Sequence, residues 1–147
     1  MRWTSMTTIA VAVAALSAPP IAAAPQLDNL PAAVRAAVKA ETKNATITHV
    51  AKEKEHGKTV YEIESLVGNR RRDFMVDASG KVYEIEEQLD LAQAPAAVRA
   101  AIVAKGTVQQ LELVTTNGTV HYEGKAKSKA GKMVSFDLDA NGRPMKH

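Results

Sequence analysis

Apolar residues first recur with a helical period in this chain. Leu30, Val34 and Val38 are spaced four apart, and the same spacing returns between residues 94 and 102. This spacing places one apolar stripe on each of two predicted helices. A proline stands just before each stripe, where a first helical turn tolerates it, and Asn44 and Gly106 mark the predicted helix ends.

After each predicted helix the pattern changes to strict alternation, which is typical of half-buried strands. Tyr61 and Ile63 share one face, whereas Glu62 and Glu64 take the other. Turn signals such as His56-Gly57 separate the alternating segments. The predicted strands are 46–55, 59–67, 71–77 and 81–87, then 107–116, 119–127, 133–139 and a short last strand at 143–147.

The two periods together predict the hydrophobic core. It consists of apolar residues on the inner stripes of the helices and strands of both halves: Val34, Val38, Tyr61, Ile63, Phe74, Val76, Tyr83, Ile85, Val98, Ile102, Phe136 and Leu138.

Parts of the sequence occur twice. Residues 31–37 recur letter for letter as residues 95–101, and Asp-Ala-Ser-Gly at 77–80 is followed later by Asp-Ala-Asn-Gly at 139–142. These ordered matches predict an α+β fold of two tandem repeats, each one helix packed on a four-stranded antiparallel meander sheet. The repeats would cover residues 30–90 and 91–147, with a short last strand in the second. One copy alone would be marginally stable, so we expect the copies to share a core or join their sheets.

The first residues predict export. Arg2 precedes a short apolar run, which Pro19-Pro20 interrupts before a series of small residues. This pattern is typical of a secretory signal peptide, and the run is too short to span a membrane. We expect a signal peptide at 1–23, an N-terminal segment at 24–29, a mature chain without a membrane span, and a periplasmic or secreted location.

Composition and motifs favour a folded chain without catalytic chemistry. The chain is 46% apolar and 24% charged, and it has no cysteine, which excludes disulfides and thiol chemistry. Its four histidines have no short metal-ligand spacing, and no serine stands in a Gly-x-Ser-x-Gly turn. We therefore predict that the protein is not an enzyme and that it has no cofactor, catalytic residue or metal site.

One motif resembles the start of a calcium-binding loop. Asp137, Asp139 and Asn141 alternate before Gly142, as ligands do in an EF-hand. The glutamate of the twelfth position would lie beyond the last residue, and the first copy has Met75 in place of Asp137. A plain turn shared by both copies is therefore the favoured interpretation.

The charged residues are divided unevenly between the two copies. Residues 30–90 carry ten basic and eleven acidic residues, whereas residues 91–147 carry eight and four. We expect opposite charge on the two polar sheet faces, and a solvated hairpin end at residues 70–72. Nucleic-acid binding is not expected, because the polar faces lack stacking aromatic residues.

Two segments carry a family resemblance. Val-Tyr-Glu-Ile at 60–63 and Asp-Ala-Ser-Gly-Lys-Val-Tyr-Glu-Ile at 77–85 resemble the PepSY-like proteins. These proteins are related in architecture to the beta-lactamase inhibitor protein and to PepSY modules in propeptides of thermolysin-like metalloproteases. The second copy departs from the pattern, with Gly124 in place of Ile63 and Pro144-Met145 in place of Val82-Tyr83. The resemblance implies a non-enzymatic binding or inhibitory module of the cell envelope.

Together these observations predict an exported module that binds a protein partner in the cell envelope, with inhibition or regulation of a protease or hydrolase as the expected role. The alternative is a periplasmic protein that binds or senses a small ligand or metal ion. The oligomeric state stays open. The candidate binding surface is the polar face of the strands: Glu62, Glu64, Arg71, Glu84, Glu86, Glu123, Lys125 and Lys127.

Overall fold

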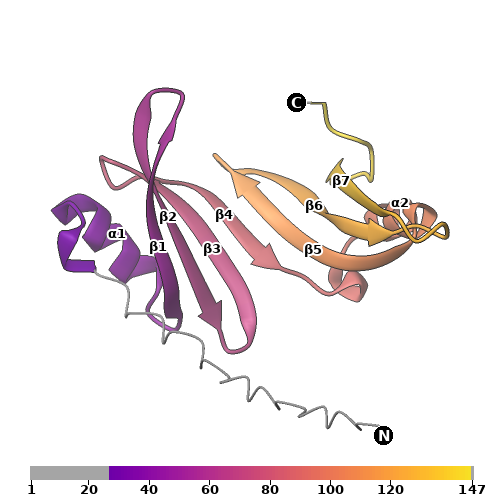
Figure 1. Cartoon of the computed structure of the whole chain (residues 1–147), viewed down its shortest axis with the longest axis horizontal. Helices are drawn as coiled ribbons and strands as arrows, with labels where there is room; N and C mark the ends of the chain where they lie inside the picture. The colour runs from indigo at the N-terminus through magenta and orange to yellow at the C-terminus, as the bar shows by residue number, and fades with distance from the viewer. Residues whose placement is uncertain (1–26, 147) are drawn as a thin grey trace, which may run out of the picture.

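A computed structural model describes residues 27–146 of the chain (Figure 1). The predicted signal peptide and its cleavage point lie outside the described residues. Within that range, none of the helices has the length and apolar character needed to cross a membrane.

Two ten-residue helices, α1 (Ala32–Glu41) and α2 (Ala96–Lys105), lie at opposite ends of the molecule (Figure 1). Each follows a proline and is preceded by a short 3-10 turn, η1 (Leu27–Asn29) or η2 (Leu91–Gln93). Gly106 caps the end of α2, as predicted. α1 ends before Asn44, with Thr42 as its C-cap residue. The backbone N–H and the hydroxyl of Thr42 both donate to the carbonyl of Val38, at 3.0 and 2.7 Å.

The strands of residues 27–146 form one antiparallel sheet in chain order. The strands are β1 (Thr46–Glu55), β2 (Lys58–Val67), β3 (Arg70–Asp77), β4 (Val82–Gln88), β5 (Thr107–Thr116), β6 (Thr119–Lys127) and β7 (Met133–Asp139). β4 pairs with β5, so the sheets of the two halves join. The strand expected at 143–147 is reduced to one bridge between Leu138 and Pro144, because proline has no N–H to donate to a ladder.

Both helices pack on the same face of this sheet. Ile63 lies opposite Phe74, which lies opposite Ile85, and Ile85 lies opposite Thr115 on β5. The first core cluster packs beneath α1 and includes Leu30, Val34, Val38, Tyr61, Ile63, Phe74 and Val76. The second packs beneath α2 and includes Ala94, Val98, Ile102, Leu111, Tyr122, Ala126, Phe136 and Leu138. Within residues 27–146, no helix packs on the other face, and we call it the helix-free face.

The core prediction is wrong at Tyr83. A β-bulge shifts the register between β3 and β4, so that Val76 lies opposite Val82 instead of Tyr83. Val82 therefore packs against the first core cluster. The Tyr83 hydroxyl donates to the Glu55 carboxylate at 2.7 Å, and its phenol pKa is raised, mainly by burial and then by this hydrogen bond.

The two Asp-Ala-x-Gly turns pack against the starts of the two helices. Gly80 follows β3 and Gly142 follows β7, both with positive φ angles, 88° and 75°. A Cβ atom at Gly80 would lie 2.6 Å from the carbonyl oxygen of Ala33, and one at Gly142 would lie 2.5 Å from that of Ala97. Only glycine meets both requirements, a positive φ and a close backbone neighbour. These turns therefore fix each helix on its part of the sheet.

Close packing also explains the glycine that departs from the family pattern. A Cβ atom at Gly124 would lie 2.0 Å from the carbonyl oxygen of Gln110 and 2.7 Å from Cζ of Phe136. A register shift between Val108 and Gln110 accompanies this approach of β5 to β6. The place of Ile63 in the first core is thus filled in the second by the ring of Phe136.

Candidate functional site

The eight predicted surface residues lie together on the helix-free face. Glu62 and Glu84 both lie opposite Met75, one on each side of β3. On the other half of the sheet, Glu123 lies opposite Asp137, and Lys125 lies opposite Ser135. The structure thus brings the candidates onto one continuous surface across β2, β3, β4 and β6. Their role in binding stays a prediction.

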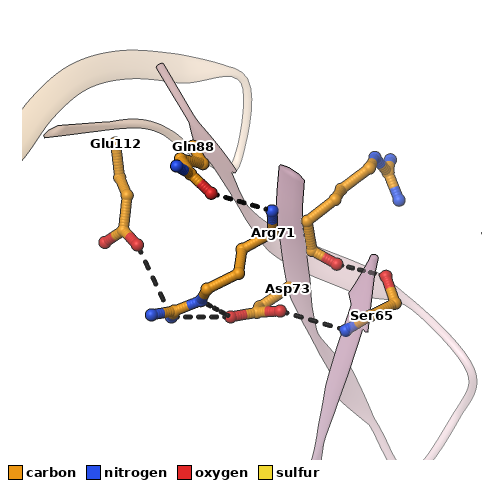
Figure 2. A network of polar contacts seen from close by, with 6 residues as sticks. Ser65, Arg71, Asp73, Gln88 and Glu112 are labelled. Carbon is orange, nitrogen blue, oxygen red and sulfur yellow. Dashed lines mark hydrogen bonds and ion pairs between the residues drawn. The ribbon is translucent and has the colours of Figure 1, made fainter. Parts of the chain in front are cut away.

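Arg71 connects three strands at the centre of this face (Figure 2). Its Nη2 lies 2.9 Å from Oδ2 of Asp73 on the same strand and 3.5 Å from Oε1 of Glu112 on β5. Its backbone N–H donates to Oε1 of Gln88 on β4, at 3.1 Å. The hydrogen bond to Asp73 raises the pKa of the Arg71 guanidinium further. The network therefore ties the first half of the sheet to the second.

Asp73 takes the place of a backbone acceptor between β2 and β3. Its Oδ1 accepts the backbone N–H of Ser65 at 3.0 Å, while the Ser65 hydroxyl donates to the carbonyl of Arg72 (Figure 2). Ser65 and Asp73 are only 1% and 7% exposed. Side chains thus form the hydrogen bonds to buried backbone groups that the pairing of β2 with β3 does not provide.

Carboxylates crowd the middle of the helix-free face. The pKa of Glu86 is raised to about 7, first by burial and then by the nearby charges of Glu112, Glu84, Glu123 and Asp73. The pKa of Glu62 is also raised, first by burial and then by Glu53 and Glu64. Burial and like charge both disfavour ionised carboxylates. This face therefore has a negative potential that favours a cationic partner.

The arginine run at 70–72 makes specific contacts. Arg70 pairs with Asp90, and its Nη1 donates to Gln93 at 2.9 Å. The Arg72 side chain is 18% exposed and pairs with Glu41 of α1 and Glu87 of β4, at 2.8 and 3.4 Å. The guanidinium of Arg72 also lies 5.8 Å from the centroid of the Phe74 ring. The expectation of a solvated hairpin end is therefore wrong for Arg72, whereas the side chains of Arg70 and Arg71 are 41% and 52% exposed.

The expected basic face of the second half is also wrong for most of its area. Glu112, Glu123 and Asp137 lie opposite one another across β5, β6 and β7. Lys125 and Lys127 occupy only the end of β6. The basic excess of this half comes mainly from residues outside the strands: Arg99, Lys105, Lys129, Lys132, Arg143 and Lys146.

His121 lies beside this row of carboxylates. It is 8% exposed, and its Nε2 lies 2.9 Å from Oε1 of Glu123, two residues along β6. One ligand atom from each of His121, Glu123 and Asp137 lies within 4.8 Å of the others. The scatter of histidines along the sequence concealed this group, because Asp137 comes from the next strand.

The residues of the calcium-like motif form a turn. Oδ1 of Asp139 accepts the backbone N–H groups of Asn141 and Arg143 at 2.8 and 2.9 Å. These bonds lower the pKa of Asp139. Oδ1 of Asp77 accepts the backbone N–H groups of Ser79 and Lys81 in the same way. The shared motif therefore builds a turn in both halves.

Sequence reasoning did not place Glu112, Gln88 or His121 in the candidate site. Alternation along β5 predicts that Glu112 points to the same face as Val114, but it does not predict which β4 residue lies beside it. That information comes from the joining of β4 to β5. Glu112 and Gln88 thus depend on the pairing between the two halves, whereas the group at His121 depends on the pairing of β6 with β7.

Comparison with known proteins identifies the fold. Residues 31–86 match the PepSY family, described as the peptidase propeptide and YPEB domain. The first half of the chain is a PepSY-like module. The matching segment of this PepSY-like chain begins at the proline before α1 and ends within β4. Among proteins with curated descriptions, none matches the sequence.

Solved structures extend the similarity to both halves of this PepSY-like protein. A DUF2874 family protein from Bacteroides ovatus has a TM-score of 0.63 and 17% identity, covering 81% of this chain and 86% of its own. A BLIP-like protein from Bacteroides fragilis has a TM-score of 0.59 and 17% identity, covering 80% of this chain and 84% of its own. A chain from Bacteroides eggerthii, provisionally described as periplasmic, has a TM-score of 0.64 and 15% identity, covering 80% of this chain and 86% of its own. At these identities the likeness concerns the fold.

Proposed function

We propose that this PepSY-like protein is an exported, non-enzymatic module that binds a protein partner of the cell envelope through its helix-free face. The observation that carries the proposal is the carboxylate-rich face of a seven-stranded sheet, which no helix of the described residues covers because α1 and α2 both pack on the opposite side. The short apolar N-terminal run supports export. The periplasmic description of the Bacteroides eggerthii structure agrees with that location.

The charges of the face favour a partner with a basic segment. Burial, and after it the charges of several nearby carboxylates, raise the pKa of Glu86 to about 7. A bound cation would lower the repulsion among these carboxylates. Arg71, Asp73 and Glu112 form a rigid centre, because each is held by contacts within the sheet. A preformed charged surface increases the association rate of a complementary partner.

Inhibition or regulation of an envelope or secreted protease or hydrolase is the finer form of this proposal. The PepSY match and the name of the BLIP-like structural neighbour support it. The partner would then be blocked by occupation of its surface, without chemistry on this chain. Binding of a metal ion or small ligand is the second candidate, and it is favoured by the group formed by His121, Glu123 and Asp137.

Charge reversal tests the protein-binding proposal. The purified chain is used to capture envelope proteins, and the association rate of each captured protein is then compared with that of a fourfold variant. The variant carries Glu62→Lys, Glu64→Lys, Lys125→Glu and Lys127→Glu, so its net charge is unchanged. We expect slower association, most strongly at low salt, where surface charges are least screened.

A matched control keeps the net charge and alters the helix side instead. Asp28 and Lys39 are both exposed, next to or on α1. The double variant Asp28→Lys and Lys39→Glu should associate as fast as the wild type. Equal association rates for the wild type and the fourfold variant, with both folded by circular dichroism, would refute the proposed surface.

A further inference from the structure

The helix-free face holds a group of potential metal ligands at the β6–β7 end of the sheet. His121 and Glu123 are two residues apart on β6, so their side chains share a face. Asp137 lies directly opposite Glu123 on β7. The three side chains each offer one ligand atom, and these atoms lie within 4.8 Å of one another. Small side-chain movements would bring all three around one ion.

The donor set is that of a transition metal of the zinc class. Zn²⁺ binds imidazole nitrogen and carboxylate oxygen at about 2.0–2.2 Å and accepts three protein ligands with an open fourth position. Ca²⁺ requires six to eight oxygen ligands, whereas this group offers an imidazole nitrogen and the carboxylates of only two residues. His121 is 8% exposed, so its imidazole is already held in place. Its Nε2 points to Glu123, at 2.9 Å from Oε1.

The neighbouring charges give a second, independent reason to expect a cation. Glu112, Glu123 and Asp137 lie opposite one another on three adjacent strands, an arrangement of like charges that destabilises a sheet. Arg71 compensates Glu112 at one end of the row, at 3.5 Å. A divalent ion between Glu123 and Asp137 would compensate the other end. Lys125, two residues along β6, is exposed and can turn to solvent.

The first half of the sheet provides an internal comparison. Glu62 lies opposite Met75 on β2 and β3, as Glu123 lies opposite Asp137 on β6 and β7. Val60 stands two residues before Glu62, where His121 stands before Glu123. The same sheet geometry therefore carries one carboxylate in the first half and three ligands in the second. The ligand set is a property of residues in the second half and not of the fold alone.

We propose that His121, Glu123 and Asp137 form a binding site for one divalent transition-metal ion, with Zn²⁺ as the favoured ion. This proposal deepens the second candidate function, binding of a metal ion, and it does not rest on protein binding by the helix-free face, which requires neither His121 nor Asp137. Water or a group from another molecule would complete the coordination of the ion.

Calorimetric titration of the purified chain with Zn²⁺ alone tests the site. We expect one ion per chain at this group and a melting temperature that rises with zinc concentration. His121→Gln and Asp137→Asn should each weaken zinc binding at least about tenfold. Loss of a residue that only orients a metal ligand typically costs about 10–100-fold in affinity, and these two variants each remove a ligand itself. An equal concentration of Ca²⁺ should not compete.

Two control variants separate the site from general surface binding. His49→Gln removes another histidine of the helix-free face, and Glu62→Gln removes the carboxylate that corresponds to Glu123. Both should bind zinc like the wild type, and circular dichroism should show all four variants folded. Zinc affinity unchanged by His121→Gln and Asp137→Asn would overturn the proposal. A wild-type melting temperature that zinc does not raise would overturn it even if those variants failed to fold.

Discussion

Replacement of Asp73 by alanine tests whether side chains hold β2 and β3 together at the centre of the sheet. Asp73 is 7% exposed, and its two carboxylate oxygens have different partners. Oδ1 accepts the buried N–H of Ser65 at 3.0 Å, and Oδ2 lies 2.9 Å from Nη2 of Arg71. Alanine removes both interactions, whereas asparagine retains an oxygen for the Ser65 N–H and loses both the charge and the acceptor oxygen that face Arg71.

The two losses differ in size. A buried donor left without an acceptor costs about 1–3 kcal/mol, and Ser65 is 1% exposed. The Arg71 side chain is 52% exposed and keeps Glu112 at 3.5 Å, so loss of its pair with Asp73 costs only about 0.5–1 kcal/mol. We expect Asp73→Ala to lower the free energy of unfolding by about 2–4 kcal/mol and Asp73→Asn by about 1 kcal/mol.

Urea unfolding followed by far-ultraviolet circular dichroism measures both values under the same conditions. The unfolding slope should be the same for all three proteins, so that midpoints report stability. Equal losses for the alanine and asparagine variants, within about 0.5 kcal/mol, would show that the Ser65 N–H does not depend on Asp73. A loss below about 1 kcal/mol for alanine would refute the whole description of the network.

Three further predictions concern the core, a turn and the pH dependence of stability. Phe74 is 1% exposed, so Phe74→Ala should cost about 3–5 kcal/mol in urea unfolding, and a loss below about 1 kcal/mol would place this ring outside the core. Gly142→Ala should lower the melting temperature more than Gly57→Ala, because both residues have positive φ but only Gly142 has a backbone atom within 3.0 Å of the added Cβ; equal effects would contradict the packing of this turn on α2. Burial raises the pKa of Glu86 to about 7, above the value of about 4.3 for an unfolded glutamate. The contribution of Glu86 to stability is therefore fully present below about pH 4.3 and is lost as the pH rises through about 7. After screening, this loss is on the order of 1–2 kcal/mol. Glu86→Gln should remove this part of the pH dependence, and an unchanged stability profile between about pH 5 and pH 8 would contradict the burial of this carboxyl.

Local sequence patterns predicted the elements well because both periods are strong in this chain. Predicted and observed strand bounds agree within about one residue for the first seven strands, and β1, β5, β6 and β7 have the predicted bounds. Tyr83 shows where alternation fails. The bulge that moves Val82 into its place arises from the pairing of β3 with β4, and the alternation within β4 alone carries no sign of it.

The sequence predicted which face of the sheet the candidate residues occupy, but it did not predict which of them are in contact. Alternation places Glu62, Arg71 and Glu123 on a polar face, and the structure agrees. The contact of Arg71 with Glu112 depends on β4 pairing with β5, and that pairing joins segments with no turn signal between them. The group at His121 depends in the same way on the register of β6 with β7. Long-range pairing therefore determines which charges meet.

Site-specific photocrosslinking in a host that exports the chain tests the central claim, binding through the helix-free face, most directly. A photoreactive residue is placed at Lys125 on the helix-free face or at Val103 on α2, two exposed positions in the same half. A second pair, Glu64 and Lys39, makes the same comparison in the first half. We expect a crosslinked protein partner from positions 64 and 125 and none from positions 39 and 103. Crosslinks that form from the two helix positions, and not from the two sheet positions, would contradict binding through the helix-free face.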